Sequence, residues 1–186
     1  MPVYQSGFMG QIHILYYGGS TPPTGTLVNW FMKVIFLDCD GVLNYTKWYT
    51  SEAYQTLTNT EELDIDPDVI ERLNRLSAET GSYFVISSSW KISSGCYFRL
   101  SRAGLKNVID KTPDLIWNAN LRGFKYSRGE EIAMWLNAHA DVTDYIIIDD
   151  CCNFNEDQIP HAVIVDPMYG FTEDDYDKAY TMLKSL

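Results

Sequence analysis

Residues 31–44 read FMKVIFLDCDGVLN and join a hydrophobic run to a pair of acids. The apolar residues end at Leu37, and Asp38, Cys39 and Asp40 follow. An apolar run without polar alternation is typical of a strand that is buried on both faces of a parallel sheet. Ligands of such sheets bind beyond the carboxyl ends of the strands. The two acids therefore stand where a functional site is expected.

The chain after Lys33 alternates short apolar runs with amphipathic stretches. Buried strands are predicted at 33–38, 83–87, 145–150 and 162–166, with a shorter one at 107–110. Helices are predicted at 66–81, 128–139 and 172–186, the first with Asp66 as its N-cap and Gly81 at its end. This alternation predicts an α/β fold, namely a doubly wound, Rossmann-like parallel sheet with helices on both faces.

Length and composition fit one globular domain. The 186 residues are enough to bury a sizeable core, and 46% hydrophobic with 21% charged residues is ordinary for a globular protein. No apolar run approaches the roughly 20 residues that cross a bilayer, and the N-terminus lacks a signal-peptide pattern. We therefore expect a cytoplasmic protein that does not use a membrane. The four cysteines lack metal-type C-x-x-C spacing, which favours reduced thiols.

Residues 1–31 differ in composition from the rest of the chain. They contain GGSTPPTGT at 18–26, which is typical of a loop or linker. One interpretation is a non-native extension upstream of a start at Met32. The alternative is that QIHILYY, at 11–17, adds a strand to a sheet edge. In both cases we expect the functional domain to span 32–186.

Charge is distributed unevenly along the chain. The formal net charge is −11, which argues against a general nucleic-acid coat. Residues 91–128, however, hold eight basic and two acidic residues, a net charge of +6, against 6 basic and 23 acidic residues, a net charge of −17, elsewhere. A basic segment on an acidic body fits an anionic ligand held at one place, although a solvated surface without a partner fits as well.

Acids or hydroxyls follow three of the predicted strands. Besides Asp38 and Asp40, Ser87 to Ser89 follow one strand, and Asp149 and Asp150 end another. Four carboxylates that meet at one sheet edge repel one another strongly unless a cation lies among them. Ligands that are all oxygen favour a hard ion, most simply Mg²⁺.

These motifs resemble the haloacid dehalogenase (HAD) superfamily. DCDGV at 38–42 matches its D-x-D-x-T/V signature, Ser87 resembles its second motif, and Asp149 with Asp150 resembles its fourth. The agreement in order and strand context spans roughly 33–170. More narrowly, DGVLN, SSSW, RGEEIAMWL and DPMYGFT look like the small HAD domain of Swiss Army Knife RNA-repair-type proteins.

The resemblance implies a role for each acid. Asp38 would attack phosphorus and form an aspartyl-phosphate, while Asp40 would protonate the leaving group and then activate water. Asp38, the backbone carbonyl of Asp40, Asp149 and Asp150 would hold Mg²⁺. Haloacid dehalogenases lack the second acid, so Asp40 favours phosphoryl chemistry.

The resemblance also implies polar and basic partners for the phosphate. Ser87 would hydrogen-bond a phosphoryl oxygen, with Ser88 as its alternate. The superfamily needs a cation near the helix before the second acidic strand, and Arg128 is our choice over Lys125 and Arg122. Lys91, which follows SSSW, and Lys125 are further candidates for binding the substrate phosphate, although Lys91 lacks the bidentate fork of an arginine.

Residues 45–65 occupy the place where many HAD enzymes insert a cap domain. Twenty-one residues are too few for a folded cap, so we expect a minimal cap or none. An open site suits a large or polymeric substrate. The aromatic residues of this segment could stack on a base or simply pack over the domain's rim; they are Tyr45, Trp48, Tyr49 and Tyr54.

The sequence thus predicts a Mg²⁺-dependent phosphohydrolase, with a phosphorylated substrate such as a nucleic-acid 3′-phosphate end. The alternatives are a phosphatase of a small ester such as a nucleotide, and a non-catalytic binding module that keeps the fold. The sequence indicates no partner protein.

Overall fold

The computed structural model describes residues 32–57, 64–115 and 126–185. The predictions for residues 1–31 and for Arg122 and Lys125 lie outside these described residues. Within them, five strands form one parallel sheet in the order β3-β2-β1-β4-β5. The strands are β1 (Met32–Leu37), β2 (Ser82–Ile86), β3 (Val108–Lys111), β4 (Val142–Asp149) and β5 (Ala162–Ile164). The predicted fold class is confirmed.

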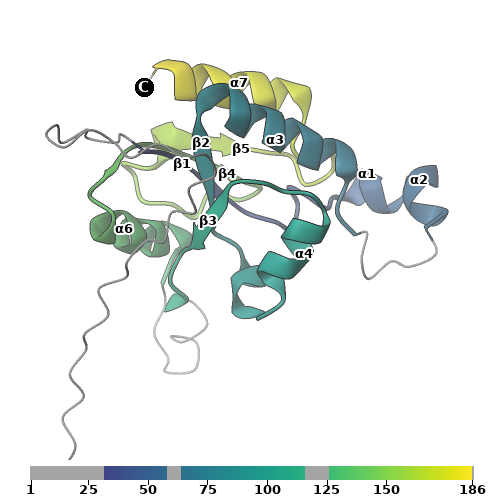
Figure 1. Ribbon diagram of the computed structural model, residues 1–186, viewed down its shortest axis with the longest axis horizontal. Helices are drawn as coiled ribbons and strands as arrows, with labels where there is room; N and C mark the ends of the chain where they lie inside the picture. The colour runs from purple at the N-terminus through teal and green to yellow at the C-terminus, as the bar shows by residue number, and fades with distance from the viewer. Residues whose placement is uncertain (1–31, 58–63, 116–125, 186) are drawn as a thin grey trace, which may run out of the picture.

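Helices cover both faces of this sheet (Figure 1). On one face, α3 (Pro67–Thr80) and α7 (Glu173–Ser185) lie side by side, and α4 (Cys96–Arg102) adds buried side chains to the same core. On the other face lies α6 (Arg128–Ala138). The short elements are α1 (Thr46–Tyr49), α2 (Glu52–Gln55), η1 (Ser89–Ile92) and η2 (Ile159–His161).

The central strand β1 supplies both cores because alternate side chains point to opposite faces. Ile35 and Leu37 belong to the core under α3 and α7, whereas Val34 and Phe36 belong to the core over α6, and all four are fully buried. A strand that is apolar throughout is therefore required at this position, as its sequence predicts.

Helix α3 shows why the predicted helix boundaries are reliable where capping residues are present. The Asp66 side chain accepts a hydrogen bond from the backbone N–H of Asp68, and Pro67 occupies the first turn. Gly81 ends the helix in the left-handed conformation with φ 70°, and its N–H donates to the carbonyl of Ser77.

The strand order places the carboxyl end of β1 at the centre of the sheet. After β1, the chain builds outward through β2 and β3 on one side, and later through β4 and β5 on the other. The carboxyl end of β1 therefore lies between the ends of β2 and β4, which is where doubly wound sheets bind ligands.

In the part of the chain that the structure describes, no helix is long and apolar enough to cross a membrane.

Candidate active site

The ends of three neighbouring strands bring the predicted polar residues together. Leu37 pairs with Ile86 of β2 and with Ile148 of β4, so the residues that follow share one edge. The Asp38 N–H donates to the Ile148 carbonyl at 3.0 Å, and the Ser87 N–H donates to the Leu37 carbonyl at 2.8 Å. Asp38, Ser87 and Asp149 thus start from adjacent, hydrogen-bonded backbone positions.

Arg128 lies between the two buried carboxylates of this edge. Its Nη1 is 3.3 Å from Asp38 Oδ1, and its Nε is 3.5 Å from Asp149 Oδ2. Burial works to lower the pKa of Arg128, but the charges of Asp38 and Asp149 outweigh it and raise the pKa above its ordinary value. Of the two considered cations that the structure describes, Lys91 and Arg128, Arg128 is the one that lies against the acids.

Asp38 is nearly inaccessible, at 5% exposed. Burial raises the pKa of Asp38 to about 7, and the neighbouring charge of Asp149 adds to the rise, while Arg128 and a hydrogen bond from Ser88 oppose it. The charge of Arg128 therefore does not offset the effect of burial on the Asp38 carboxyl. A further cation near Asp38 would favour its ionised form, which is the form that a nucleophile needs.

Asp40 lies two residues further along, in the turn that leaves β1. Its Oδ1 accepts hydrogen bonds from Asn44 Nδ2 at 3.0 Å and from Trp90 Nε1 at 2.9 Å. Cys39, between the two acids, points the other way and is fully buried in the core under α3 and α7. Burial raises the pKa of Cys39 well above its ordinary value, so its thiol stays protonated and acts as a small apolar group.

The two serines after β2 differ in what they contact. Ser88 is fully buried and caps η1 by accepting from the backbone N–H of Trp90 at 3.3 Å, and its hydroxyl works to lower the pKa of Asp38. Ser87 is 1% exposed, and its Oγ has no hydrogen-bond partner among the described residues. A buried hydroxyl without a partner is costly, and a phosphoryl oxygen would satisfy it.

The acids of the second strand end have the donor chemistry of a hard-metal site. Asp149 is fully buried, and its Oδ2 accepts no hydrogen bond among the described residues. Asp150 and Cys151 follow it, and one potential ligand atom from each of the three residues lies within 4.8 Å of the others. Burial raises the pKa of Cys151 to about 11, so this thiol is a poor ligand at neutral pH. The remaining donors are oxygens, which fit Mg²⁺.

Lys91 does not lie free for a substrate phosphate. Its ammonium is 4% exposed and forms a buried ion pair with Glu131 of α6, and it donates to Thr112 Oγ1 at 3.0 Å. Glu131 also accepts from the Leu115 N–H at 2.9 Å. A phosphate would have to displace this carboxylate, so we leave Lys91 out of the proposed phosphate-binding residues. Lys125 lies outside the described residues.

The position of Arg128 depends on a contact that the sequence did not indicate. The Gly129 N–H donates to the Asn153 carbonyl at 3.1 Å, and the Gly129 carbonyl accepts from Gln158 Nε2 at 3.0 Å. A Cβ on Gly129 would lie 2.5 Å from both Asn155 N and Gln158 Oε1. The loop after β4 therefore holds the first turn of α6, and with it Arg128, against the acids.

The aromatic residues of 45–57 mostly contact one another or the body of the domain. Trp48 is buried and meets Tyr54 edge to face, and Tyr54 also meets Tyr49. The Tyr45 hydroxyl donates to Asp66, the N-cap of α3. Tyr49 remains 38% exposed, so it is the member of this group that is most accessible to a ligand.

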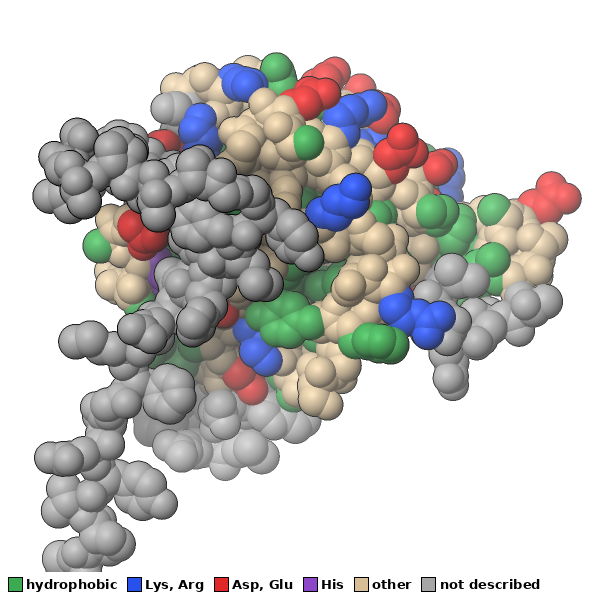
Figure 2. All heavy atoms as spheres, viewed as in Figure 1, with side chains coloured by type: hydrophobic (Ala, Val, Ile, Leu, Met, Phe, Trp, Pro, Cys, Tyr) green, Lys and Arg blue, Asp and Glu red, His purple; other side chains and the backbone are tan. Residues whose placement is uncertain are grey.

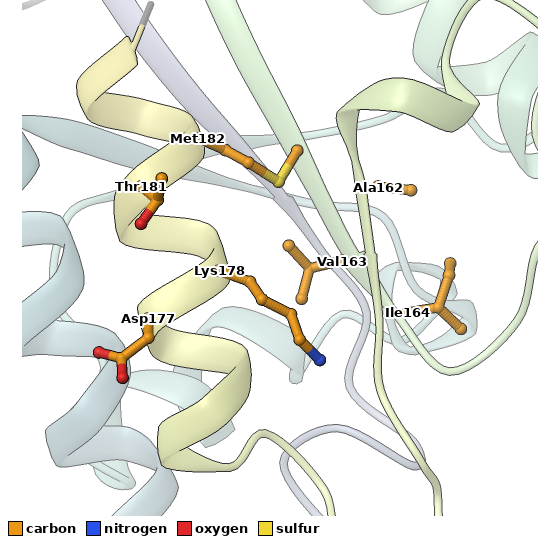
Figure 3. Close-up of a pocket in the computed structure, with 7 residues that line it drawn as sticks. All are labelled: Ala162, Val163, Ile164, Asp177, Lys178, Thr181 and Met182. Carbon is orange, nitrogen blue, oxygen red and sulfur yellow. The ribbon is translucent and has the colours of Figure 1, made fainter.

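A separate hollow of about 660 Å³ lies between α7 and β5 (Figure 3). The residues that line it are Ala162, Val163, Ile164, Asp177, Lys178, Thr181 and Met182. None of them is a predicted site residue, so this hollow is distinct from the strand-end cluster.

Comparison with known families agrees with the fold and the site. A parallel sheet with acids at the ends of β1 and β4 is the arrangement of the HAD superfamily, and the family described as "HAD domain in Swiss Army Knife RNA repair proteins" matches residues 34–176. The chain belongs to this family, which supports a HAD-type phosphatase. Comparisons with curated proteins and with solved structures found no match.

Proposed function

We propose that the protein is a Mg²⁺-dependent phosphohydrolase that acts through an aspartyl-phosphate on Asp38. The observation that carries this proposal is the place of Asp38: it directly follows the central strand, with its Oδ1 3.3 Å from Arg128 Nη1, and stands two residues before a second acid, Asp40. A buried carboxylate beside a fixed cation is suited to in-line attack on phosphorus.

The residues of this edge divide the reaction between them. Asp38 attacks phosphorus, the bond from phosphorus to the leaving oxygen breaks, and Asp40 gives that oxygen a proton. Water then attacks the aspartyl-phosphate, Asp40 takes the proton of that water, and Asp38 is released. Arg128 offsets the charge between Asp38 and the phosphate, and Ser87 donates to a phosphoryl oxygen.

Mg²⁺ would be held by Asp38, the Asp40 carbonyl, Asp149 and Asp150. When bound, it neutralises phosphate charge and favours the ionised form of the nucleophile. Asp149 Oδ2 accepts no hydrogen bond among the described residues and has Arg128 Nε only at 3.5 Å; this and the raised pKa of Asp38 support a further cation at this position.

Nucleic-acid phosphate ends are the substrates that we propose. The support is threefold: the matched family is described from RNA repair proteins, residues 91–128 carry a net charge of +6, and the insertion after β1 holds only two four-residue helices in its described part. An open site admits the end of a polymer.

The test compares phosphate release from a 3′-phosphorylated oligonucleotide, a mononucleotide and an aryl phosphate, each with Mg²⁺ and with chelator. We expect Mg²⁺-dependent turnover that is fastest on the oligonucleotide and absent in Asp38→Asn. Turnover that persists with chelator, or in Asp38→Asn, contradicts the mechanism. A preference for the mononucleotide at all salt concentrations favours a small-ester phosphatase, and no release from any ester favours a binding module.

A further inference from the structure

Two side chains from different segments hold the same oxygen of Asp40. Asn44 Nδ2, from the same turn, and Trp90 Nε1, from η1, both donate to Oδ1. The Asn44 amide is oriented by the Gly41 N–H, which donates to its Oδ1 at 3.2 Å and so directs the amino group toward Asp40. An indole N–H and an amide N–H are donors, so Oδ1 is the acceptor of both bonds and its orientation is fixed from two sides.

We propose that Trp90 is a positioning residue for proton transfer, which holds Asp40 so that Oδ2 alone exchanges a proton with the substrate. This inference rests on the proposed phosphohydrolase function. SSSW, which ends in Trp90, is part of the resemblance, and the family match spans Trp90, but neither assigns a role to its side chain.

Trp90 is itself held on several sides. The Arg99 guanidinium lies 3.7 Å from the centroid of the Trp90 ring and pairs with Asp64. The backbone N–H of Trp90 donates to Ser88 Oγ at 3.3 Å. Figure 2 shows hydrophobic and basic side chains together over the region of α4, the helix that carries Arg99. The indole therefore ties Asp40 to η1 and to Ser88, which follows β2.

The proton balance of the reaction gives Oδ2 two tasks. When the Asp38–phosphorus bond forms and the phosphorus–oxygen bond of the ester breaks, the Oδ2 proton passes to the leaving oxygen. When water forms its bond to phosphorus and the Asp38–phosphorus bond breaks, a water proton returns to Oδ2. One water is consumed, an alcohol and phosphate are produced, and the Trp90 N–H is retained throughout.

The test is Trp90→Phe, which keeps an aromatic ring for Arg99 but removes the N–H donor. An alkyl phosphate needs its leaving oxygen protonated, whereas p-nitrophenyl phosphate has a good leaving group and depends little on a general acid. We expect kcat to fall about tenfold on the alkyl phosphate and less than about twofold on p-nitrophenyl phosphate, with KM unchanged on both.

Trp135→Phe is the matched control, because the Trp135 indole also donates to an aspartate, Asp110, at 2.7 Å, away from the strand-end acids. We expect this variant to change both substrates equally. Equal loss on both substrates in Trp90→Phe, or no loss on either, overturns the positioning role.

A second measurement does not depend on turnover. The indole N–H signal of Trp90, identified by its loss in Trp90→Phe, should move upfield in Asp40→Ala because its acceptor is removed. An unmoved signal overturns the contact on which the inference rests. Wild-type protein that releases no phosphate from any ester overturns the proposed function, and this outcome is distinct from turnover whose leaving-group dependence is the same in Trp90→Phe.

Discussion

The backbone of Gly41 lies directly against the carboxylate of Asp150. A Cβ built on Gly41 would stand 2.3 Å from Asp150 Oδ2, and Gly41 has a φ of +74°, where side chains are strained. The turn after β1 and the end of β4 therefore approach each other as closely as they do only because this residue has no side chain.

Gly41→Ala is expected to damage the site more than the fold. The new methyl group must displace Asp150 or the Asp40 turn, so turnover should fall at least about 100-fold, and the free energy of unfolding should fall by about 1–3 kcal/mol. Gly81→Ala is the matched control, since Gly81 has a φ of +70° but open space around its Cβ position. It should lose about 1 kcal/mol of stability and keep its turnover, as measured by urea unfolding and phosphate release. An equal loss of turnover in the two variants would contradict the close approach of Gly41 to Asp150.

The buried Asp38 predicts a pH dependence of stability in the absence of Mg²⁺. Its pKa is raised from 3.8 to about 7 in the folded protein, so the folded state retains a proton that the unfolded state has lost. This contribution to stability is full below pH 3.8 and is lost as the pH rises toward 7. With chelator present, the melting temperature of Asp38→Asn should therefore rise relative to wild type across this window. If the melting temperatures of the two proteins changed with pH in the same way, burial would not raise the pKa of Asp38.

The Lys91–Glu131 ion pair predicts a large loss of stability when one partner is removed. The side chains are 4% and 0% exposed, so Lys91→Met removes the paired ammonium from beside a buried carboxylate and should cost about 3–5 kcal/mol by urea unfolding. Lys91→Met with Glu131→Gln should recover part of this loss, because Gln keeps an acceptor for the Leu115 N–H without a charge. Lys178→Met is the control: its pair with Asp175 leaves Lys178 63% exposed and should cost less than about 1 kcal/mol.

Gly129→Ala is expected to act on Arg128 through the backbone. The added Cβ would meet Asn155 N at 2.5 Å, so the first turn of α6 must shift, and kcat should fall at least about tenfold because the cation moves relative to Asp38. Gly95→Ala provides the comparison, because the nearest atom to its Cβ would be Ser93 Oγ at 3.7 Å, an ordinary contact. If both variants turned over at the wild-type rate, the loop after β4 would have no part in placing Arg128.

A chain that begins at Met32 should keep the fold and the activity. The described β1 starts at Met32, whose N–H donates to the Asp141 carbonyl at 3.3 Å, and both cores are built from Val34 onward within the described residues. We expect its melting temperature and turnover to match those of the full chain. Loss of solubility would instead favour a role for the preceding residues in covering a sheet edge.

The strands and their polar ends were predictable because each depends on adjacent residues. Apolar runs located β1, β2, β4 and β5, and capping residues located α3. The ends of strands were less certain: β4 begins at Val142 rather than at Tyr145, because it pairs with the start of β1 through residues that the apolar run does not include. β5 stops at Ile164, although the Val165 N–H still donates to the backbone carbonyl of Asp149.

The contacts that position the site were not predictable, because they join distant segments. Trp90 and Asp40 are 50 residues apart, and Lys91 and Glu131 are 40 apart. In the sequence alone, Lys91 is one cation in a basic segment, and only the folded chain shows that it forms a buried ion pair with Glu131. Gly129 is similarly uninformative until Gln158 is seen beside it.

The strand order has a consequence for biosynthesis. β1 is made first but lies between β2 and β4, and Asp38 acquires Arg128 and Asp149 only after another 90 or more residues have been added. A partly synthesised chain that has already paired β1 with β2, and β2 with β3, still exposes one side of β1 and lacks Arg128 beside Asp38. On the proposed mechanism, Asp38 therefore lacks the charge partners that it needs until α6 and β4 have packed beside β1.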